Sequence, residues 1–108
     1  MSQEQNKRSE IKQYGDFLQS IRDFMRKEAI YEVVTDPLMS RVVPDRGVDP
    51  ISVQVAAGDF YLQTSPEWEM KKLLARGSGS IYQMVNVFRD DLYARWHKLL
   101  VGAYRYDA

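Results

Sequence analysis

The chain alternates between helix-like and strand-like patterns of apolar residues. From position 11 the apolar residues recur at spacings of three and four, which predicts an amphipathic helix running to about Lys27; its stripe comprises Ile11, Tyr14, Leu18, Ile21 and Met25. Residues 1–10 are polar and aperiodic, so we interpret them as a disordered lead-in to a folded part that spans 11–108.

Strand-like patterns follow this helix. A β-branched run ends at Asp36-Pro37, a hairpin is interrupted at Gly58-Asp59, and two further apolar runs flank a charged segment; the predicted strands span 30–35, 51–55, 60–64, 81–88 and 99–106. Residues 40–50 contain Pro and Gly among charges and are expected to form a loop.

A second helix is predicted after the hairpin. Thr64 or Ser65 can cap it, Pro66 suits its first position, Glu67 lies in its first turn, and Gly77 can end it. The order of helix, strand, hairpin, helix, strand, loop and strand predicts an α+β fold: an antiparallel sheet with helices on one face. At 108 residues, one domain is the limit.

Composition narrows the possible partners. Fifteen Lys and Arg balance fifteen Asp and Glu, so no general attraction to nucleic acid or anionic lipid is expected. A phosphate site would need local clustering, for which the candidates are Lys71, Lys72, Arg89 and Arg95. There is no Cys and only one His, so we expect no disulfide and no metal site. The sequence has no signal peptide or membrane-length apolar run, which predicts a cytoplasmic protein without a membrane partner.

Three clusters could carry chemistry, and each has a simpler interpretation. Glu67 at a strand-to-helix junction could receive a substrate ammonium, or its segment could simply cap a helix. Arg89 could bind a phosphate through its forked guanidinium, or lie in a solvated turn. The run Arg95-Trp96-His97-Lys98 could hold a nucleotide by charge and stacking, or lie on the surface.

Three segments carry a family resemblance. AIYEVVTDPLM (29–39), TSPEWEMKKLLARGSGSIYQMVNVFRDD (64–91) and YARWH (93–97) resemble class II aminoacyl-tRNA synthetases of the lysine type, and within them the elongation factor P lysine ligases. Residues 17–39 are similar to motif 1, the dimer interface of the family, and residues 81–106 to motif 2, which holds ATP. The short polar start, where lysyl-tRNA synthetases carry an anticodon-binding barrel, favours the ligase branch.

The resemblance implies roles for particular residues. Ser65, Pro66 and Glu67 would bind the amino-acid substrate, with Glu67 pairing its ammonium, and Arg89 would be the catalytic residue on the ATP α-phosphate. The further ATP-binding positions would be Asp90, Asp91, His97 and Lys98. Asp91 stands where the family usually has Glu, and Lys98 where it has Asn, which weakens the expectation for Lys98. The implied cofactors are ATP and Mg²⁺.

The resemblance also sets the expected function. Motif 3, which bears the second ATP-binding Arg of the family, has no counterpart, so we expect a partial synthetase core that retains binding sites without complete catalysis. Expected partners are a second copy through motif 1 and elongation factor P, whereas tRNA is disfavoured by the zero net charge. Two alternatives stay open: a non-catalytic interaction or dimerisation module, and a gene remnant.

Overall fold

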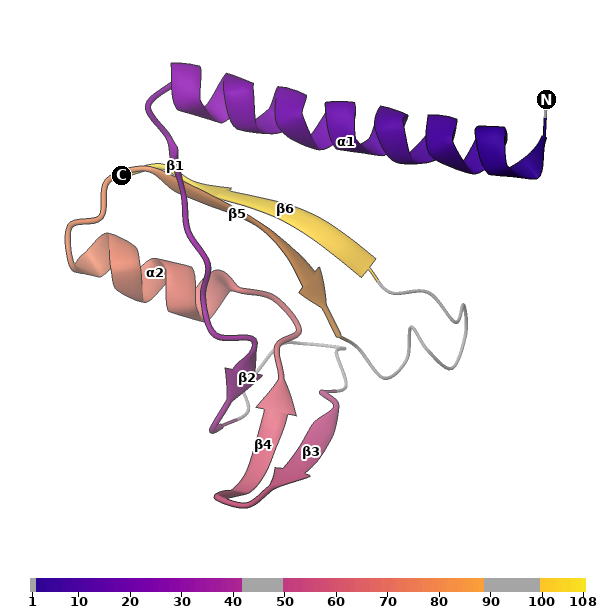
Figure 1. The fold of residues 1–108 in the computed structure, drawn as a ribbon. Helices are drawn as coiled ribbons and strands as arrows, with labels where there is room; N and C mark the ends of the chain where they lie inside the picture. Colours follow the sequence, from indigo (N-terminus) through magenta and orange to yellow (C-terminus); the bar gives the residue numbers. More distant parts are fainter. Residues whose placement is uncertain (1, 42–49, 89–99) are drawn as a thin grey trace.

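The described residues form an α+β fold, as the sequence predicted. The computed structural model describes residues 2–41, 50–88 and 100–108 (Figure 1). Its elements are α1 (Gln3–Lys27), β1 (Tyr31–Glu32), β2 (Leu38–Met39), β3 (Ser52–Val55), β4 (Gly58–Leu62), α2 (Glu67–Ala75), β5 (Ile81–Val87) and β6 (Leu100–Tyr106). No helix within these ranges is long and apolar enough to cross a membrane.

The first of two three-stranded sheets has the strand order β1-β5-β6. β5 and β6 pair antiparallel from Ile81↔Tyr106 to Val87↔Leu100, as predicted. β1 pairs with β5 in parallel, so this sheet is mixed rather than antiparallel. The long connection between β1 and β5, which includes a second sheet and α2, lets the chain re-enter the sheet in the same direction.

The second sheet has the order β2-β4-β3. Its β3–β4 hairpin was predicted, whereas β2 was not, because the strand before it was expected to end at Asp36-Pro37 and a loop was expected over 40–50. Asp36 Oδ1 accepts the Leu38 backbone N–H at 3.0 Å, which turns the chain around the proline and lets pairing resume at Leu38↔Leu62. The predicted strand over 30–35 is reduced to β1, although the Val33 N–H still donates to the Tyr82 carbonyl at 2.9 Å.

Helix α2 forms where the sequence predicted it. Its C-terminus is closed by Gly77 at φ +89°: the Gly77 N–H donates to the Leu74 carbonyl and the Ser78 N–H to the Leu73 carbonyl, the two bonds of a Schellman motif. The N-cap of α2 differs from the prediction: it is Pro66, whose side chain makes no capping hydrogen bond. Neither Thr64 nor Ser65 therefore occupies the predicted cap position.

Helix α1 begins at Gln3, so the predicted start at Ile11 is wrong. A capping box explains the earlier start: the Gln5 N–H donates to Ser2 Oγ, and the Ser2 N–H donates to Gln5 Oε1. The box thus pairs two of the backbone N–H groups that the start of a helix leaves without intrahelical partners. Because its residues are polar, apolar spacing does not indicate it.

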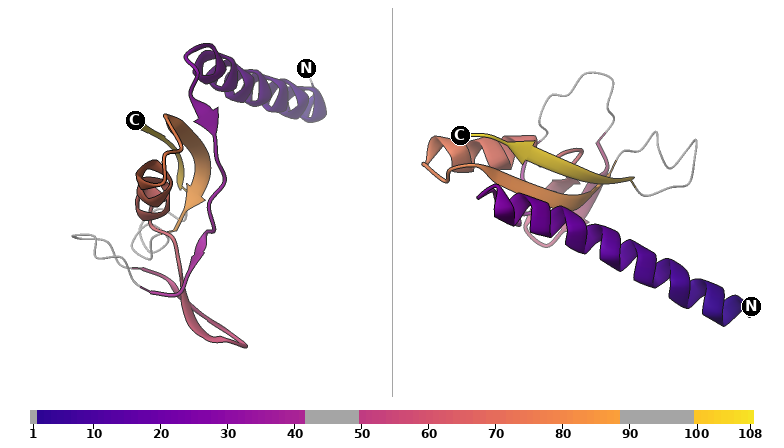
Figure 2. Two further views of the ribbon diagram at one scale, coloured as in Figure 1. Left: turned by 90° about the vertical axis from the view of Figure 1, so that its left-hand side faces the viewer. Right: turned by 90° about the horizontal axis from the view of Figure 1, so that it is seen from above.

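Helix α1 is attached to the sheet by its C-terminal part. Arg22 Nε lies 3.1 Å from Glu32 Oε1, and the Arg26 guanidinium lies over the Tyr31 ring at 5.3 Å from its centre. No α1 residue is buried, and Figure 2 shows the N-terminal part projecting past the sheet. The radius of gyration of 16.7 Å accordingly exceeds the roughly 13 Å of a compact domain of this length. The apolar side of α1 is thus only partly covered: Leu18, Ile21 and Met25 are half-buried, whereas Ile11 and Tyr14 are exposed.

The predicted placement of both helices on one face also differs from the structure. Figure 1 shows α1 above the β5–β6 pair and α2 below it, and the left view of Figure 2 agrees. The core is small: its buried apolar residues are Ile30, Met70 of α2, and Ile81, Tyr82 and Val87 of β5. No residue of α1 is fully buried, although Leu18, Ile21 and Met25 are half-buried.

Two glycines should respond oppositely to alanine. In both, a new Cβ would meet no atom within 4 Å. Gly15→Ala inside α1 should stabilise the protein by about 0.5–1 kcal/mol because alanine loses less backbone entropy. Gly77→Ala should destabilise it by roughly 1–2 kcal/mol because φ is +89°. Urea unfolding followed by circular dichroism measures both, and changes of the same sign would contradict the account.

Tyr82 should make the fold sensitive to alkali. Burial and the nearby Glu32 carboxylate raise the pKa of Tyr82, so the folded protein holds the phenol proton more tightly than the unfolded chain does. This stabilisation is complete below about pH 10, the ordinary tyrosine pKa, and is lost as pH rises through the higher folded value. Tyr82→Phe should therefore flatten the alkaline fall in the urea midpoint. The exposed Tyr31→Phe is the control, and an equal effect of both changes would refute the assignment.

Candidate functional site

The predicted substrate residues meet at the start of α2. Pro66 is buried, and its carbonyl accepts the Met70 N–H at 3.0 Å, the first bond of the helix. Ser65 Oγ lies 3.4 Å from the Glu67 N–H that it accepts. Glu67 sits in the first turn, where the partial positive charge of the helix N-terminus favours a carboxylate. The structure thus brings Ser65, Pro66 and Glu67 together, with Glu67 open to solvent.

The Glu67 carboxylate is bound to a primary ammonium. Lys71 Nζ lies 2.6 Å from Glu67 Oε1, and both side chains are about half exposed. This hydrogen bond and the charge of Glu67 raise the pKa of Lys71. Because an exposed ion pair of this kind is weak, the carboxylate can exchange one ammonium partner for another. Glu67 therefore has the chemistry expected of an ammonium-binding residue.

Tyr106 of β6 lies beside this pair. Burial raises the pKa of Tyr106, and the Glu67 charge raises it further, whereas Lys71 opposes the shift. Helix α2, which carries the Glu67–Lys71 pair, contacts β6.

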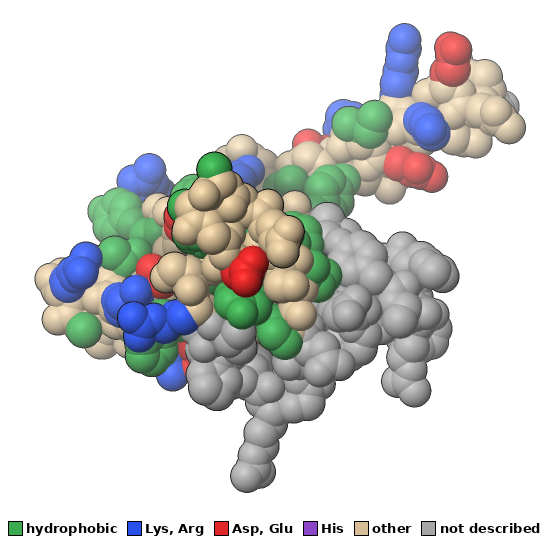
Figure 3. All heavy atoms as spheres, turned by 90° about the horizontal axis from the view of Figure 1, so that it is seen from below, with side chains coloured by type: hydrophobic (Ala, Val, Ile, Leu, Met, Phe, Trp, Pro, Cys, Tyr) green, Lys and Arg blue, Asp and Glu red, His purple; other side chains and the backbone are tan. Residues whose placement is uncertain are grey.

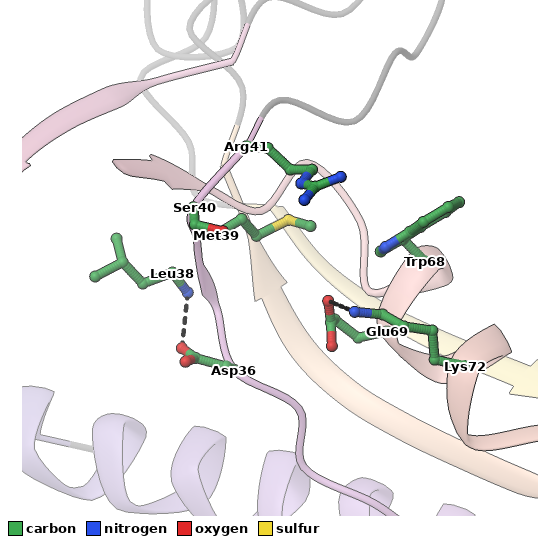
Figure 4. Close-up of a pocket in the computed structure, with 8 residues that line it drawn as sticks. All are labelled: Asp36, Leu38, Met39, Ser40, Arg41, Trp68, Glu69 and Lys72. Carbon is green, nitrogen blue, oxygen red and sulfur yellow. Dashed lines mark hydrogen bonds and ion pairs between the residues drawn. The ribbon is translucent and has the colours of Figure 1, made fainter. Parts of the chain in front are cut away.

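The other side of α2 borders a separate hollow of about 350 Å³ (Figure 4). Lys72 Nζ pairs with Glu69 Oε1 at 2.9 Å there, and lies 6.0 Å from the centre of the Trp68 ring. The opposite wall of the hollow comes from the β2 region, including Met39 and Arg41. Lys71 and Lys72 are therefore paired with different carboxylates. The predicted phosphate cluster also includes Arg89 and Arg95, which lie outside the described residues, so it stays a prediction.

Gln63, directly before the substrate segment, was not among the sequence candidates. Its side chain is 1% exposed, and its Nε2 donates to the Asn86 carbonyl at 3.1 Å. Gln83 is equally buried and binds Thr35, accepting the Thr35 N–H at 2.9 Å and donating to Thr35 Oγ1 at 2.9 Å. An amide among apolar strand residues is the signal that could have identified both positions, since buried polar groups require partners.

The predicted nucleotide residues cannot be placed. Arg89, Asp90, Asp91, His97 and Lys98 all lie outside the described residues, as does Arg95. Within the described ranges, no group of three or more His, Asp or Glu residues is arranged to hold a metal ion. The expected binding of ATP and Mg²⁺ therefore stays a prediction from the sequence.

Comparison with known proteins identifies the class. The family description of class II tRNA synthetases (D, K and N) matches residues 1–99, and the chain belongs to this family. Among curated proteins, it is similar to elongation factor P–(R)-β-lysine ligases: 34% identical over 95 residues to that of Vibrio cholerae, and 41% identical over 83 residues to that of Erwinia tasmaniensis. These alignments cover 82% and 71% of this chain, but only 29% and 26% of the relatives.

A solved structure supports the fold. The asparaginyl-tRNA synthetase of Pyrococcus horikoshii, determined with asparaginyl-adenylate, superimposes with a TM-score of 0.58 over 67% of this chain and 16% of that one. The sequences are 18% identical, so this similarity concerns the fold alone. The described elements thus correspond to part of a class II synthetase core, and the chain spans less than a third of the curated relatives it matches.

Proposed function

We propose that this chain forms the amino-acid-binding and ATP-binding front part of a lysine ligase of the elongation factor P type. The observation that carries the proposal is the 34–41% identity to proteins named elongation factor P–(R)-β-lysine ligase. Elongation factor P is then the proposed acceptor of the amino acid. In the reaction proposed, the amino-acid carboxylate attacks the α-phosphorus of ATP and pyrophosphate leaves.

The geometry of Glu67 supports this substrate class. A lysine or β-lysine brings a primary ammonium of the same chemistry as Lys71 Nζ, which already contacts the carboxylate. We propose that the substrate ammonium replaces Lys71 at Glu67, while Ser65 lies beside it. On the nucleotide side, we propose that Arg89 binds the α-phosphate and offsets the charge that develops as the adenylate forms.

We propose ligand binding, rather than complete turnover, for the part of the ligase that these 108 residues represent. They span 29% of the Vibrio cholerae relative and 26% of the Erwinia tasmaniensis relative. Adenylate formation depends on several charged groups placed together, so we assign turnover to a whole ligase and binding to this part. Pyrophosphate exchange distinguishes binding from turnover.

Substitution of Glu67 tests the amino-acid site. Glu67→Gln should weaken (R)-β-lysine or lysine binding by roughly tenfold or more, because it removes a charge-assisted contact. Isothermal titration with each amino acid measures the change. The fold should be unaffected, since the lost Lys71 pair is exposed, and the urea midpoint should stay near that of the unmodified protein.

Glu69→Gln provides the matched control for this experiment. Glu69 lies in the same helix and is also paired with a lysine, but on the other side. It should leave amino-acid binding unchanged. If the two variants bind equally well, Glu67 is not the ammonium site, and if the unmodified chain binds neither amino acid nor millimolar ATP, the proposed function fails.

A second candidate function, self-association, is favoured by α1. Four large apolar side chains on this helix are more than half exposed: Ile11, Tyr14, Phe17 and Phe24. Figure 3 shows hydrophobic side chains interspersed with charged ones on the part of α1 that projects beyond the sheet. Clustered exposed aromatics are typical of interfaces, and the family resemblance assigns residues 17–39 to a dimer interface. We propose that two copies pair through α1.

Removing aromatics from α1 tests this pairing. The double change Phe17→Ser and Phe24→Ser should convert a dimer to a monomer at tens of micromolar, measured by light scattering after gel filtration. Val34→Ser is the control, since Val34 is 88% exposed but lies outside α1. A chain that is monomeric without any substitution would remove this candidate.

A further inference from the structure

The hollow between α2 and the β2 region has no role in the reaction proposed above (Figure 4). One of its walls is formed by residues of the segment 36–41, and the other by Trp68, Glu69 and Lys72 of α2. Glu67, the proposed ammonium site, is not among the residues that line it. The hollow is therefore a separate surface that borders the same helix.

The charged side chains of the hollow differ in whether they have partners. Glu69 Oε1 is paired with Lys72 Nζ at 2.9 Å, and Asp36 Oδ1 accepts the Leu38 N–H at 3.0 Å. Arg41 is exposed, and it forms no ion pair with any residue that the structure describes. The Arg41 guanidinium is therefore the charged group of the hollow that a ligand can bind without displacing a described partner, and such a ligand is an anion.

Trp68 lies across the hollow from Arg41. It is 49% exposed, and Figure 4 shows its indole nitrogen on the ring edge that faces the other lining side chains, with the Arg41 guanidinium directed toward the ring. The half-buried Met39 lies on the same wall as Arg41. A guanidinium and an indole N–H are both donors. Together with Met39 they suit a carboxylate on an aliphatic stem, because the carboxylate accepts from the donors while the stem contacts the thioether.

The open form of the hollow favours a protein segment over a small molecule. The Lys72 and Glu69 side chains are 47% and 31% exposed although they are paired with each other. Pockets for small molecules enclose most of the ligand surface, whereas Trp and Arg are enriched among the residues that dominate binding at protein interfaces. The proposed reaction also needs a protein acceptor, which must contact the ligase outside the amino-acid site.

We propose that this hollow is a docking site for the protein acceptor, and that an acidic side chain of the acceptor binds between Arg41 and Trp68. The proposal rests on the proposed function, since that function supplies the need for an acceptor. Asp36 begins the segment that ends at Arg41, and its negative charge repels a second acidic group. The acidic side chain is therefore directed to the Arg41 end of the hollow.

The test measures how tightly elongation factor P, the proposed acceptor, binds the full chain in isothermal titration. Arg41→Ala and Trp68→Ala should each weaken binding by roughly tenfold, since each removes one side of the carboxylate site. The loss caused by Arg41→Ala should become smaller at higher salt, because the interaction is between opposite charges near solvent. Trp68→Phe, which keeps a ring but removes the N–H, should also weaken binding and serves if Trp68→Ala does not fold.

Arg76→Ala is the matched control. Arg76 is the C-cap of α2 and does not line the hollow, so its loss removes the same charge from the same helix region and should leave acceptor binding unchanged. Lysine affinity should stay the same in all these variants, because none of the changed side chains belongs to the proposed amino-acid site.

The possible results separate the docking site from the proposed function. If the unmodified chain binds lysine but does not bind elongation factor P at tens of micromolar, the docking site is wrong and the proposed function stands. The same conclusion follows if Arg41→Ala weakens acceptor binding no more than Arg76→Ala does, or if the Trp68 variants bind the acceptor normally. If the unmodified chain binds neither lysine nor ATP but binds the acceptor through Arg41 and Trp68, the proposed function is wrong and the docking site is supported.

Discussion

Hydrogen bonding to β5 is the constraint on which the described structure depends. β1 and β6 pair with its two edges, the Gln83 side chain of this strand binds Thr35, and its end is bonded to Gln63. These contacts join segments up to about fifty positions apart in sequence, and so define the fold far more than the small apolar core does. The start of α2, with its candidate substrate residues, is placed by the same strand through Gln63.

Local patterns were sufficient to predict most elements and their type. The β3–β4 hairpin, α2 and the β5–β6 pair follow from alternation, capping residues and a terminating Gly77, all of which act over a few residues. The resemblance indicated Ser65, Pro66 and Glu67 as substrate residues, and this role stays a prediction; the structure places them at the start of α2. The sequence did not show that Lys71 and Lys72 point in different directions, which follows because neighbouring helix positions face different sides.

Features set by distant contacts were missed for a physical reason. The parallel pairing of β1 with β5 depends on where the intervening chain returns, and Gln63 and Gln83 are held by partners far away in sequence. The early start of α1 is a local feature, but its signal is a polar capping box rather than apolar spacing. The apolar spacing of α1 predicts a helix correctly, but it does not show how far the apolar side is covered: Ile11, Tyr14, Phe17 and Phe24 are more than half exposed.

The pairing of Glu67 with Lys71 links the fold to the proposed chemistry. A solvent-exposed carboxylate that binds a ligand must be held in place, but weakly enough for the ligand to displace its partner. An ion pair between side chains about half exposed meets both needs, because the lysine orients the carboxylate while solvent screening keeps the interaction weak. A buried pair would have been too costly to break once formed. The rigid part of the site is accordingly supplied elsewhere, by the buried Pro66 and Gln63, which leaves Glu67 as the exchangeable element.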